Sequence, residues 1–373
     1  MKKVILSWCM FVIALSFVAN VRAYNFTNVS CITANSDYLY VGSGNAVLRI
    51  DKKTGKMEVY HIPQIRETMT HNSNAVRAIK DVHGLVWVAT TYGLCQLEGD
   101  TILQIDDLDY ARAINVDANE TVWVGGVRPL TKYVENQKVA EYWLHGIELS
   151  STYSIYSIRF DSKGQMWIAT NAGQFYDEEK KENISCNLYT FSEEEGYKPV
   201  LNGWKNNMPY YGMGIDADDN IWLATNYQST GPIMYSQTEG FRFFNKDNSN
   251  YPNGWKMRDV ACCEEGVFLC ADRGLLRYNG EGFDIYPFEV GMSVVCMLFD
   301  EGNIYIGTKD LGLWRFRDGL FARVPLDTES HSAIHSTMQQ AENTCYYTID
   351  GITMTSHATG VKVKKGWKTA EKR

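Results

Sequence analysis

Five arginine and tyrosine residues occupy one recurring position of a repeated sequence. Each lies ten or eleven residues before the aromatic centre of its repeat, and the five are Arg77, Arg112, Tyr156, Tyr211 and Arg258. Guanidinium groups bind carboxylate or sulfate groups through paired hydrogen bonds, and aromatic faces stack on sugar rings and apolar groups. If the fold brings these side chains together, they predict a site for an anionic or glycan ligand.

A second group of residues is expected on the same face of the molecule. They follow the second strand of their repeats, in loops predicted to lie beside the five: Tyr92, Arg128, Asn171, Asn226, Tyr227, Asp272, Arg273 and Lys309. Alternatively, these Arg and Tyr side chains pair only with backbone carbonyls and neighbouring carboxylates at the rim of a channel. The pattern leaves both interpretations open.

Standard catalytic phrases are missing from the chain. The sequence contains no H-E-x-x-H, no G-x-S-x-G and no phosphate-binding loop. His331 and His335 share an i, i+4 spacing, but they lie in a polar linker and are interpreted as a solvated pair. Asp216 to Asn220 resembles a calcium loop in composition, yet it occupies a turn that the other repeats also have. We therefore predict neither a metal nor another cofactor.

The phrase that positions these residues is DSKGQMWIAT, Asp161 to Thr170. It predicts a tight polar turn followed by a short β-strand with Trp167 at its centre. The phrase recurs, and its equivalent aromatic centres are Tyr40, Trp87, Trp123, Trp167, Trp222, Phe268 and Tyr305. Their intervals of 47, 36, 44, 55, 46 and 37 residues indicate a repeat array.

Each repeat carries enough strands for one propeller blade. A short apolar strand precedes the turn, and two further strands follow the aromatic one, as in Gly93 to Leu97 and Thr101 to Ile105. Four antiparallel strands make a blade, and seven blades make a closed ring. The predicted fold is therefore all-β, a seven-bladed β-propeller over residues 24–326, with a short C-terminal β tail.

The ends of the chain are predicted to have other roles. Met1 to Ala23 has two lysines, an apolar run and a small-residue cleavage site, and this pattern predicts a signal peptide. Residues 327–345 are polar and predict a linker, and residues 346–373 predict two or three short strands with a basic end. Within the fourth interval, the acidic stretches Asp177 to Asn183 and Glu193 to Tyr197 predict solvated loops, while Trp204 either plugs a gap or contacts a ligand.

Net charge, cysteine content and hydropathy limit the partners, disulfides and membrane segments that the sequence allows. The formal net charge of −8 disfavours a nucleic-acid partner, which needs a basic surface. Eight Cys remain after signal cleavage and no C-x-x-C pair occurs, so free thiols and a Cys262–Cys270 disulfide are both open. No segment after the signal peptide is apolar enough to span a membrane, and we predict a monomer.

The repeat resembles that of a known family. The phrase D-x-x-G-x-W-I-A-T followed by a Gly-Leu strand is similar to the regulator-propeller (two-component regulator propeller) repeat over nearly all of Val29 to Leu326. The match is strongest at Asp81 to Leu94 and at Asp161 to Gly173. The resemblance implies an exported propeller of the kind found in periplasmic halves of hybrid two-component sensors. The C-terminal tail is similar to sorting tails of the type IX secretion pathway.

These patterns predict an exported binding or scaffold propeller without chemistry of its own. Its partner would be a glycan, an anionic small ligand or a protein, at the periplasm, the outer surface or outside the cell. One alternative is a glycan lyase or hydrolase on the same scaffold, which would need two carboxylates or a His and a Tyr in one cleft. The other is the sensory subunit of a separate membrane signalling partner.

Overall fold

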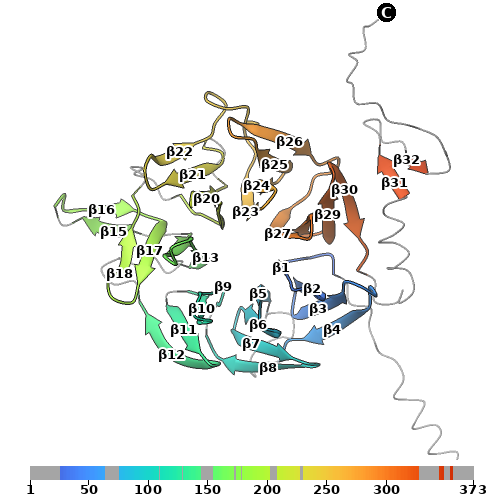
Figure 1. The fold of residues 1–373 in the computed structure, drawn as a ribbon, viewed down its shortest axis with the longest axis horizontal. Coiled ribbons are helices and arrows are strands. Elements are labelled where there is room, and N and C mark those ends of the chain that lie inside the picture. Colours follow the sequence, from blue (N-terminus) through green and yellow to red (C-terminus); the bar gives the residue numbers. More distant parts are fainter. Residues whose placement is uncertain are drawn as a thin grey trace, which may run out of the picture.

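Seven four-stranded β-sheets surround a central axis in this protein (Figure 1). The computed structural model describes residues 26–63, 75–108, 110–127, 129–143, 154–171, 174–177, 179–201, 208–226, 230–326, 344–347 and 353–355. No α-helix occurs among these residues, and so none that could span a membrane. The predicted seven-bladed β-propeller with four-stranded antiparallel blades is confirmed.

The first three blades are built from consecutive strands. Blade 1 contains β1 (Cys31–Ala34), β2 (Tyr38–Ser43), β3 (Ala46–Asp51) and β4 (Met57–His61). Blade 2 contains β5 (Val76–Val82), β6 (Leu85–Thr90), β7 (Gly93–Glu98) and β8 (Thr101–Asp106). Blade 3 contains β9 (Ala113–Val116), β10 (Val122–Gly125), β11 (Leu130–Val134) and β12 (Gln137–Tyr142).

The remaining blades follow the same order, with one insertion. Blade 4 contains β13 (Ile155–Phe160), β14 (Met166–Thr170), β17 (Leu188–Ser192) and β18 (Gly196–Pro199), and the hairpin β15 (Gln174–Asp177) with β16 (Glu182–Ser185) interrupts it. Blade 5 contains β19 (Gly212–Ile215), β20 (Ile221–Ala224), β21 (Ile233–Ser236) and β22 (Gly240–Phe243). Blade 6 contains β23 (Met257–Cys263), β24 (Gly266–Ala271), β25 (Gly274–Tyr278) and β26 (Phe283–Pro287). Blade 7 contains β27 (Val294–Asp300), β28 (Asn303–Thr308), β29 (Leu313–Arg317) and β30 (Leu320–Val324).

Antiparallel order gives the ring two different faces. In every blade the first strand is innermost, and each strand pairs with the next along the chain, apart from the inserted hairpin. The connections after second and fourth strands therefore lie on the side where inner strands begin, which we call the mouth face. The hairpin turns after first and third strands lie on the opposite side, which we call the turn face.

A hydrogen bond between an aspartate and an indole explains the repeated phrase. Trp123, Trp167 and Trp222 donate Nε1–H to the carboxylates six residues earlier, those of Asp117, Asp161 and Asp216, at 3.0, 3.0 and 2.8 Å. The other oxygen of each aspartate accepts backbone N–H groups of the turn. Both carboxylate oxygens of Asp216 accept hydrogen bonds, one from the N–H of Asn220 and one from the indole of Trp222. This supports the interpretation of Asp216 to Asn220 as a turn.

Blade 2 departs from this arrangement. Asp81 stands six residues before Trp87, but its Oδ2 accepts Asn35 Nδ2 of blade 1 at 2.9 Å. The buried Trp87 Nε1 has no hydrogen-bond partner. Asp81 Oδ1 still accepts the N–H of Gly84 at 3.1 Å, so this aspartate serves both the turn of its own blade and the contact with the preceding blade.

A small residue two positions after each aromatic centre lets neighbouring blades approach. The seven are Gly42, Ala89, Gly125, Ala169, Ala224, Cys270 and Gly307, all buried. A Cβ built on Gly125 would lie 2.4 Å from Ile155 Cγ2 of the next blade, closer than atoms can approach. The inner strand of one blade thus packs directly against the second strand of the blade before it.

The core is divided among the interfaces between blades. Seven clusters of buried apolar side chains are present in the described residues, one for each pair of neighbouring blades. The cluster between blades 7 and 1 includes Leu39 and Val41 from β2 with Tyr305 and Leu313 from β28 and β29. Because both blades consist wholly of their own strands, no exchanged strand closes the ring.

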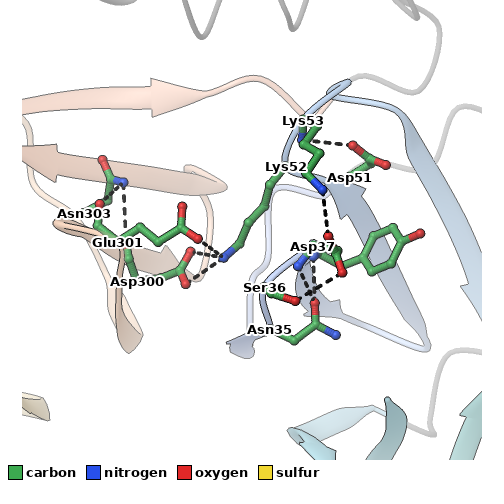
Figure 2. Close-up of polar contacts among 10 residues, drawn as sticks. Asn35, Ser36, Asp37, Asp51, Lys52, Lys53, Asp300, Glu301 and Asn303 are labelled. Carbon is green, nitrogen blue, oxygen red and sulfur yellow. Dashed lines mark hydrogen bonds and ion pairs between the residues drawn. The ribbon is translucent and has the colours of Figure 1, made fainter. Parts of the chain in front are cut away.

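An ion pair also joins blades 1 and 7. Figure 2 shows Lys52 reaching toward Asp300 and Glu301, with Nζ 2.7 Å from Asp300 and 3.4 Å from Glu301. The side chains of Lys52 and Asp300 are only 15% and 16% exposed. Lys53, the next residue, pairs with Asp37 at 3.1 Å within blade 1, where both side chains are largely in solvent.

Further sequence predictions concern the inserted hairpin, the cysteines, the tail and residues that the structure does not describe. Asp177 to Asn183, expected as a solvated loop, spans the turn of the inserted hairpin, and its ends belong to the paired strands β15 and β16. Residues 179–182 are exposed. The seven described cysteines are free, so Cys262 and Cys270 form no disulfide. In the tail, β31 (Thr344–Tyr347) pairs with β32 (Thr353–Thr355). The predicted signal peptide, the His331 and His335 pair, and Trp204 lie outside the described residues.

We expect Trp167→Phe to lower the free energy of unfolding by about 1–2 kcal/mol more than Trp87→Phe. Both substitutions remove the same atoms from buried sites, but only the first leaves a nearly buried aspartate oxygen, on Asp161, without its donor. Urea denaturation of the two variants measures the difference. Equal losses would show that the indole–aspartate bond contributes nothing to stability.

We expect Lys52→Met to lower the free energy of unfolding by about 1 kcal/mol, because it leaves the half-buried Asp300 carboxylate without its cation. Lys53→Met is the matched control and should leave the urea midpoint unchanged, since its pair is solvated. A loss in the control as large as that of Lys52→Met would contradict a specific role for the contact between blades 1 and 7.

Candidate binding site at the mouth of the central channel

One residue per blade projects into the channel where the inner strands begin. In β5, β13, β23 and β27 the register shifts by one residue, and the extra residues are Arg77, Tyr156, Arg258 and Val295. A β-bulge of this kind turns a side chain away from the regular alternation of a strand. The bulge therefore directs these four side chains toward the channel rather than into the interfaces between blades.

The other three blades place an equivalent residue just before the inner strand. The backbone N–H groups of Ser30, Arg112 and Tyr211 donate to Gly42, Gly125 and Ala224, the small residues that follow the aromatic centres. The mouth ring, as we name it, therefore comprises Ser30, Arg77, Arg112, Tyr156, Tyr211, Arg258 and Val295. Counting eleven residues back from Tyr40 and Tyr305 gives Val29 and Val294 in blades 1 and 7, and the structure places the ring residue one position later in both blades.

A cavity of about 690 Å³ opens at this ring. It is lined by all five residues predicted from the repeat, Arg77, Arg112, Tyr156, Tyr211 and Arg258. Asp272 and Lys309, from loops after second strands, also line it. Tyr92, Asn171 and Arg273 lie in such loops on the mouth face but not on the cavity wall, and Arg128 and Tyr227 lie outside the described residues.

The arginines of the ring have no acidic partners. Within the described residues, none of Arg77, Arg112 and Arg258 forms an ion pair with a carboxylate. Arg77 Nε donates to Thr91 Oγ1 at 3.2 Å, and Arg112 Nη1 donates to the hydroxyl of Tyr156 at 3.1 Å. Arg112 Nε is buried without a partner. Much of the donor capacity of these guanidinium groups is therefore unused.

Two tyrosines hold two of these arginines in place. Tyr156 and Tyr211 meet edge to face, with ring centroids 5.4 Å apart. Arg112 lies over the ring of Tyr156 at 4.9 Å, and Arg258 lies over the ring of Tyr211 at 6.0 Å. Cation–π contacts of this kind fix the direction of a guanidinium group without neutralising it.

The cavity is cationic although the chain is acidic. Its lining contains six cationic side chains and only two carboxylates, and the cations are Arg77, Arg112, Arg159, Lys256, Arg258 and Lys309. Burial, and next the charge of Arg112, lower the pKa of Arg77. Burial and then the neighbouring Arg159 lower the pKa of Lys80, against the opposing effect of Asp81. In both residues burial is the larger cause, and a neighbouring arginine adds to it.

One partly buried carboxylate, that of Asp259, also lines the cavity. Asp259 accepts the N–H of Val260 at 2.9 Å and that of Met297, in the next blade, at 2.8 Å. Burial raises its pKa to about 6, against the opposing effects of these bonds and of Arg159. Asp272, the other carboxylate of the cavity, accepts the N–H of Lys256 at 2.9 Å.

Repeat spacing missed Ser30, Arg159, Lys256 and Asp259, which also line the cavity. Arg159 and Asp259 lie deeper along inner strands, within otherwise apolar segments. The sequence does show a charged residue within an apolar strand at both positions. That pattern does not distinguish a side chain that faces the channel from one that faces a neighbouring blade.

The fold and this site define a seven-bladed β-propeller with a cationic central mouth. Residues 148–172 match the family described as "Two component regulator propeller", so the resemblance seen in the repeat is shown for blade 4. No curated protein sequence matches the chain. The similarity of the tail to sorting tails stays a prediction.

Several solved structures share the fold at low sequence identity. The extracellular domain of the putative hybrid two component system BT3049 from B. thetaiotaomicron is 19% identical over 80% of this chain, with a TM-score of 0.62. PorZ, a surface component of the type-IX secretion system of Porphyromonas gingivalis, is 11% identical over 82%, with a TM-score of 0.56. The chain spans only 40% and 39% of these two proteins. YCF48 bound to D1 peptide is 12% identical over 81% of this chain and 96% of its own length, with a TM-score of 0.58.

We expect the stability of the protein to depend on the ionisation of Asp259. Because its pKa is raised in the folded state, its contribution is present below pH 4 and is lost as the pH rises through about 6. Between pH 4 and pH 7 the wild-type protein should lose roughly 2 kcal/mol of unfolding free energy relative to Asp259→Asn. Urea denaturation of both proteins at several pH values measures this, and parallel pH profiles would contradict it.

Proposed function

We propose that the chain is an exported, non-enzymatic binding propeller that takes an anionic ligand at the mouth of its central channel. The observation that carries the proposal is the mouth ring, whose Arg77, Arg112 and Arg258 have no carboxylate partners in the described residues. Arg112 and Arg258 are partly buried, whereas Arg77 is exposed. Partly buried cations are normally paired, because desolvating an unpaired charge is costly. A ligand with carboxylate or sulfate groups would complete these contacts.

Binding without chemistry is favoured by how the cavity carboxylates are used. Asp259 and Asp272 both accept backbone N–H groups, and Asp259 joins two blades in doing so. A glycosidase needs a pair of carboxylates free to exchange protons or attack the sugar. Here both carboxylates accept backbone N–H groups, whereas the ring arginines form no ion pair with a carboxylate among the described residues.

Export is supported by the first residues and by the kind of proteins that share the fold. Met1 to Ala23 has the pattern of a signal peptide, and the similar BT3049 structure is an extracellular domain. The same likeness supports a second role, in which the propeller serves as the sensory subunit of a separate membrane signalling partner. In either role the ligand would bind at the mouth, together with the mouth-face residues Tyr92, Asn171 and Arg273 where it is large enough to reach them. Arg128 and Tyr227, which lie outside the described residues, stay predicted contacts of the same ligand.

We expect the combined substitution of Arg77, Arg112 and Arg258 by Gln to weaken anion binding by about 100-fold or more, since each charge-assisted hydrogen bond contributes about 1.5–3 kcal/mol. Binding is measured by calorimetry and on an array of neutral, uronic-acid and sulfated glycans, with released sugar assayed in the same wells. Wild-type binding should weaken as salt is raised.

The control for this experiment is Arg317→Gln, which removes an exposed arginine from the turn face. It should bind as the wild type does, and both variants should keep the wild-type melting temperature. Unchanged affinity in the triple variant would overturn the proposal. Release of sugar would show that the protein is an enzyme.

A further inference from the structure

The tyrosines of the mouth ring are engaged within the protein. Tyr156 packs its ring against Tyr211, and each of the two rings is covered by an arginine, Arg112 or Arg258. A sugar that stacked on these faces would have to displace a guanidinium group. The tyrosines therefore act as supports for cations, and the ring is built to hold anionic groups more than sugar rings.

Exposed apolar side chains lie close to the cationic cavity on the mouth face. Three large ones are between 38% and 50% exposed, and they are Tyr110, Val290 and Val295. Val295 lines the cavity, and Tyr110 and Val290 stand two residues before Arg112 and Met292, which also line it. Tyr110 also lies close enough to Arg77 to influence its pKa. We call these three residues the apolar rim.

The opposite face of the molecule is acidic. Hairpin turns of the turn face carry exposed carboxylates from all seven blades, including Asp37, Asp100, Glu120, Glu194, Asp218, Glu239, Glu264, Glu265, Glu281, Glu301 and Asp318. An anionic partner is thus repelled from the turn face and attracted to the mouth, which steers its approach. This separation of charge also explains how a chain of net charge −8 contains a cationic site.

We infer that the ligand of the mouth is an acidic segment of a protein partner, with carboxylates in the cavity and flanking apolar side chains on the rim. This inference rests on the proposed function and specifies its ligand. Polypeptide is favoured over polyanionic glycan because a peptide offers carboxylates and apolar groups together, whereas a glycan has no large apolar groups to cover the rim. A cavity of about 690 Å³ lies in the range that holds compact ligands, which suits a few inserted residues.

The test compares four probes on the purified full-length mature protein. They are a labelled ten-residue peptide of Asp, Glu, Leu and Phe, the same peptide with its acids replaced by Asn and Gln, the same peptide with Leu and Phe replaced by Ser, and an oligogalacturonate of similar charge. Affinities are measured by fluorescence anisotropy, with citrate as a small competing anion. We expect the first peptide to bind at least tenfold more tightly than each of the other three probes.

Variants separate the rim from the cavity. Tyr110→Ser with Val290→Ser should weaken the acidic, apolar peptide about tenfold and leave citrate binding unchanged. Leu103→Ser is the matched control, because Leu103 is 56% exposed but lies on the outer strand β8, and it should change neither affinity. The triple Arg→Gln variant should lose every anionic probe.

The outcomes distinguish this inference from the proposed function. If oligogalacturonate or the Ser-containing peptide binds as tightly as the apolar peptide, the mouth binds anions but the protein-partner inference is wrong. If citrate binds and no peptide does, the inference is equally overturned while the proposed function stands. If no anion binds in low salt, both are overturned.

Discussion

The structure depends on the close approach of each inner strand to the blade before it. A four-stranded sheet cannot bury both of its faces alone, so each blade packs on two neighbours. The approach requires a small residue at one place per repeat, and at Gly125 even a methyl group would collide with Ile155. Because this contact sets the depth at which every inner strand begins, it also sets where the mouth ring lies.

In three of the four blades with tryptophan at the aromatic centre, the tryptophan and the aspartate of the repeat share a hydrogen bond. The four blades with Trp at the aromatic centre have Asp six residues earlier, whereas the blades centred on Tyr40, Phe268 and Tyr305 have Ala34, Cys262 and Phe299 there. Tyrosine and phenylalanine present no indole N–H to this position, so nothing selects an acceptor. The three repeats without tryptophan are therefore variants of the same blade. They keep the small residue that close contact with the neighbouring blade requires.

The two faces of the ring differ in charge because different strand connections lie on each of them. Short hairpin turns between first and second or third and fourth strands favour Asp, Asn and Gly for local hydrogen bonding, so carboxylates collect on the turn face. Connections from a fourth strand to the next inner strand lie on the mouth face, are longer and carry Tyr110 and Val290 of the apolar rim, and the inner strands begin there with arginine and tyrosine. Net charge alone would have hidden this arrangement, because the acidic turns outnumber the cations of the cavity.

The sequence by itself determined the number of blades, their strands, and five residues of the mouth ring. These features are encoded locally, in a repeated period of polar turn, aromatic strand and small residue, and Arg77 or Arg258 could be placed by counting back from it. Tertiary structure alone decided that Ser30 and Val295 complete the ring, since the ring residue stands either ten or eleven residues before the aromatic centre and the spacing does not say which. It also decided that Arg159 and Asp259 reach the cavity and that the ring arginines form no ion pair with a carboxylate among the described residues. Those properties depend on side chains from blades far apart in the chain, whose juxtaposition arises only when the ring closes.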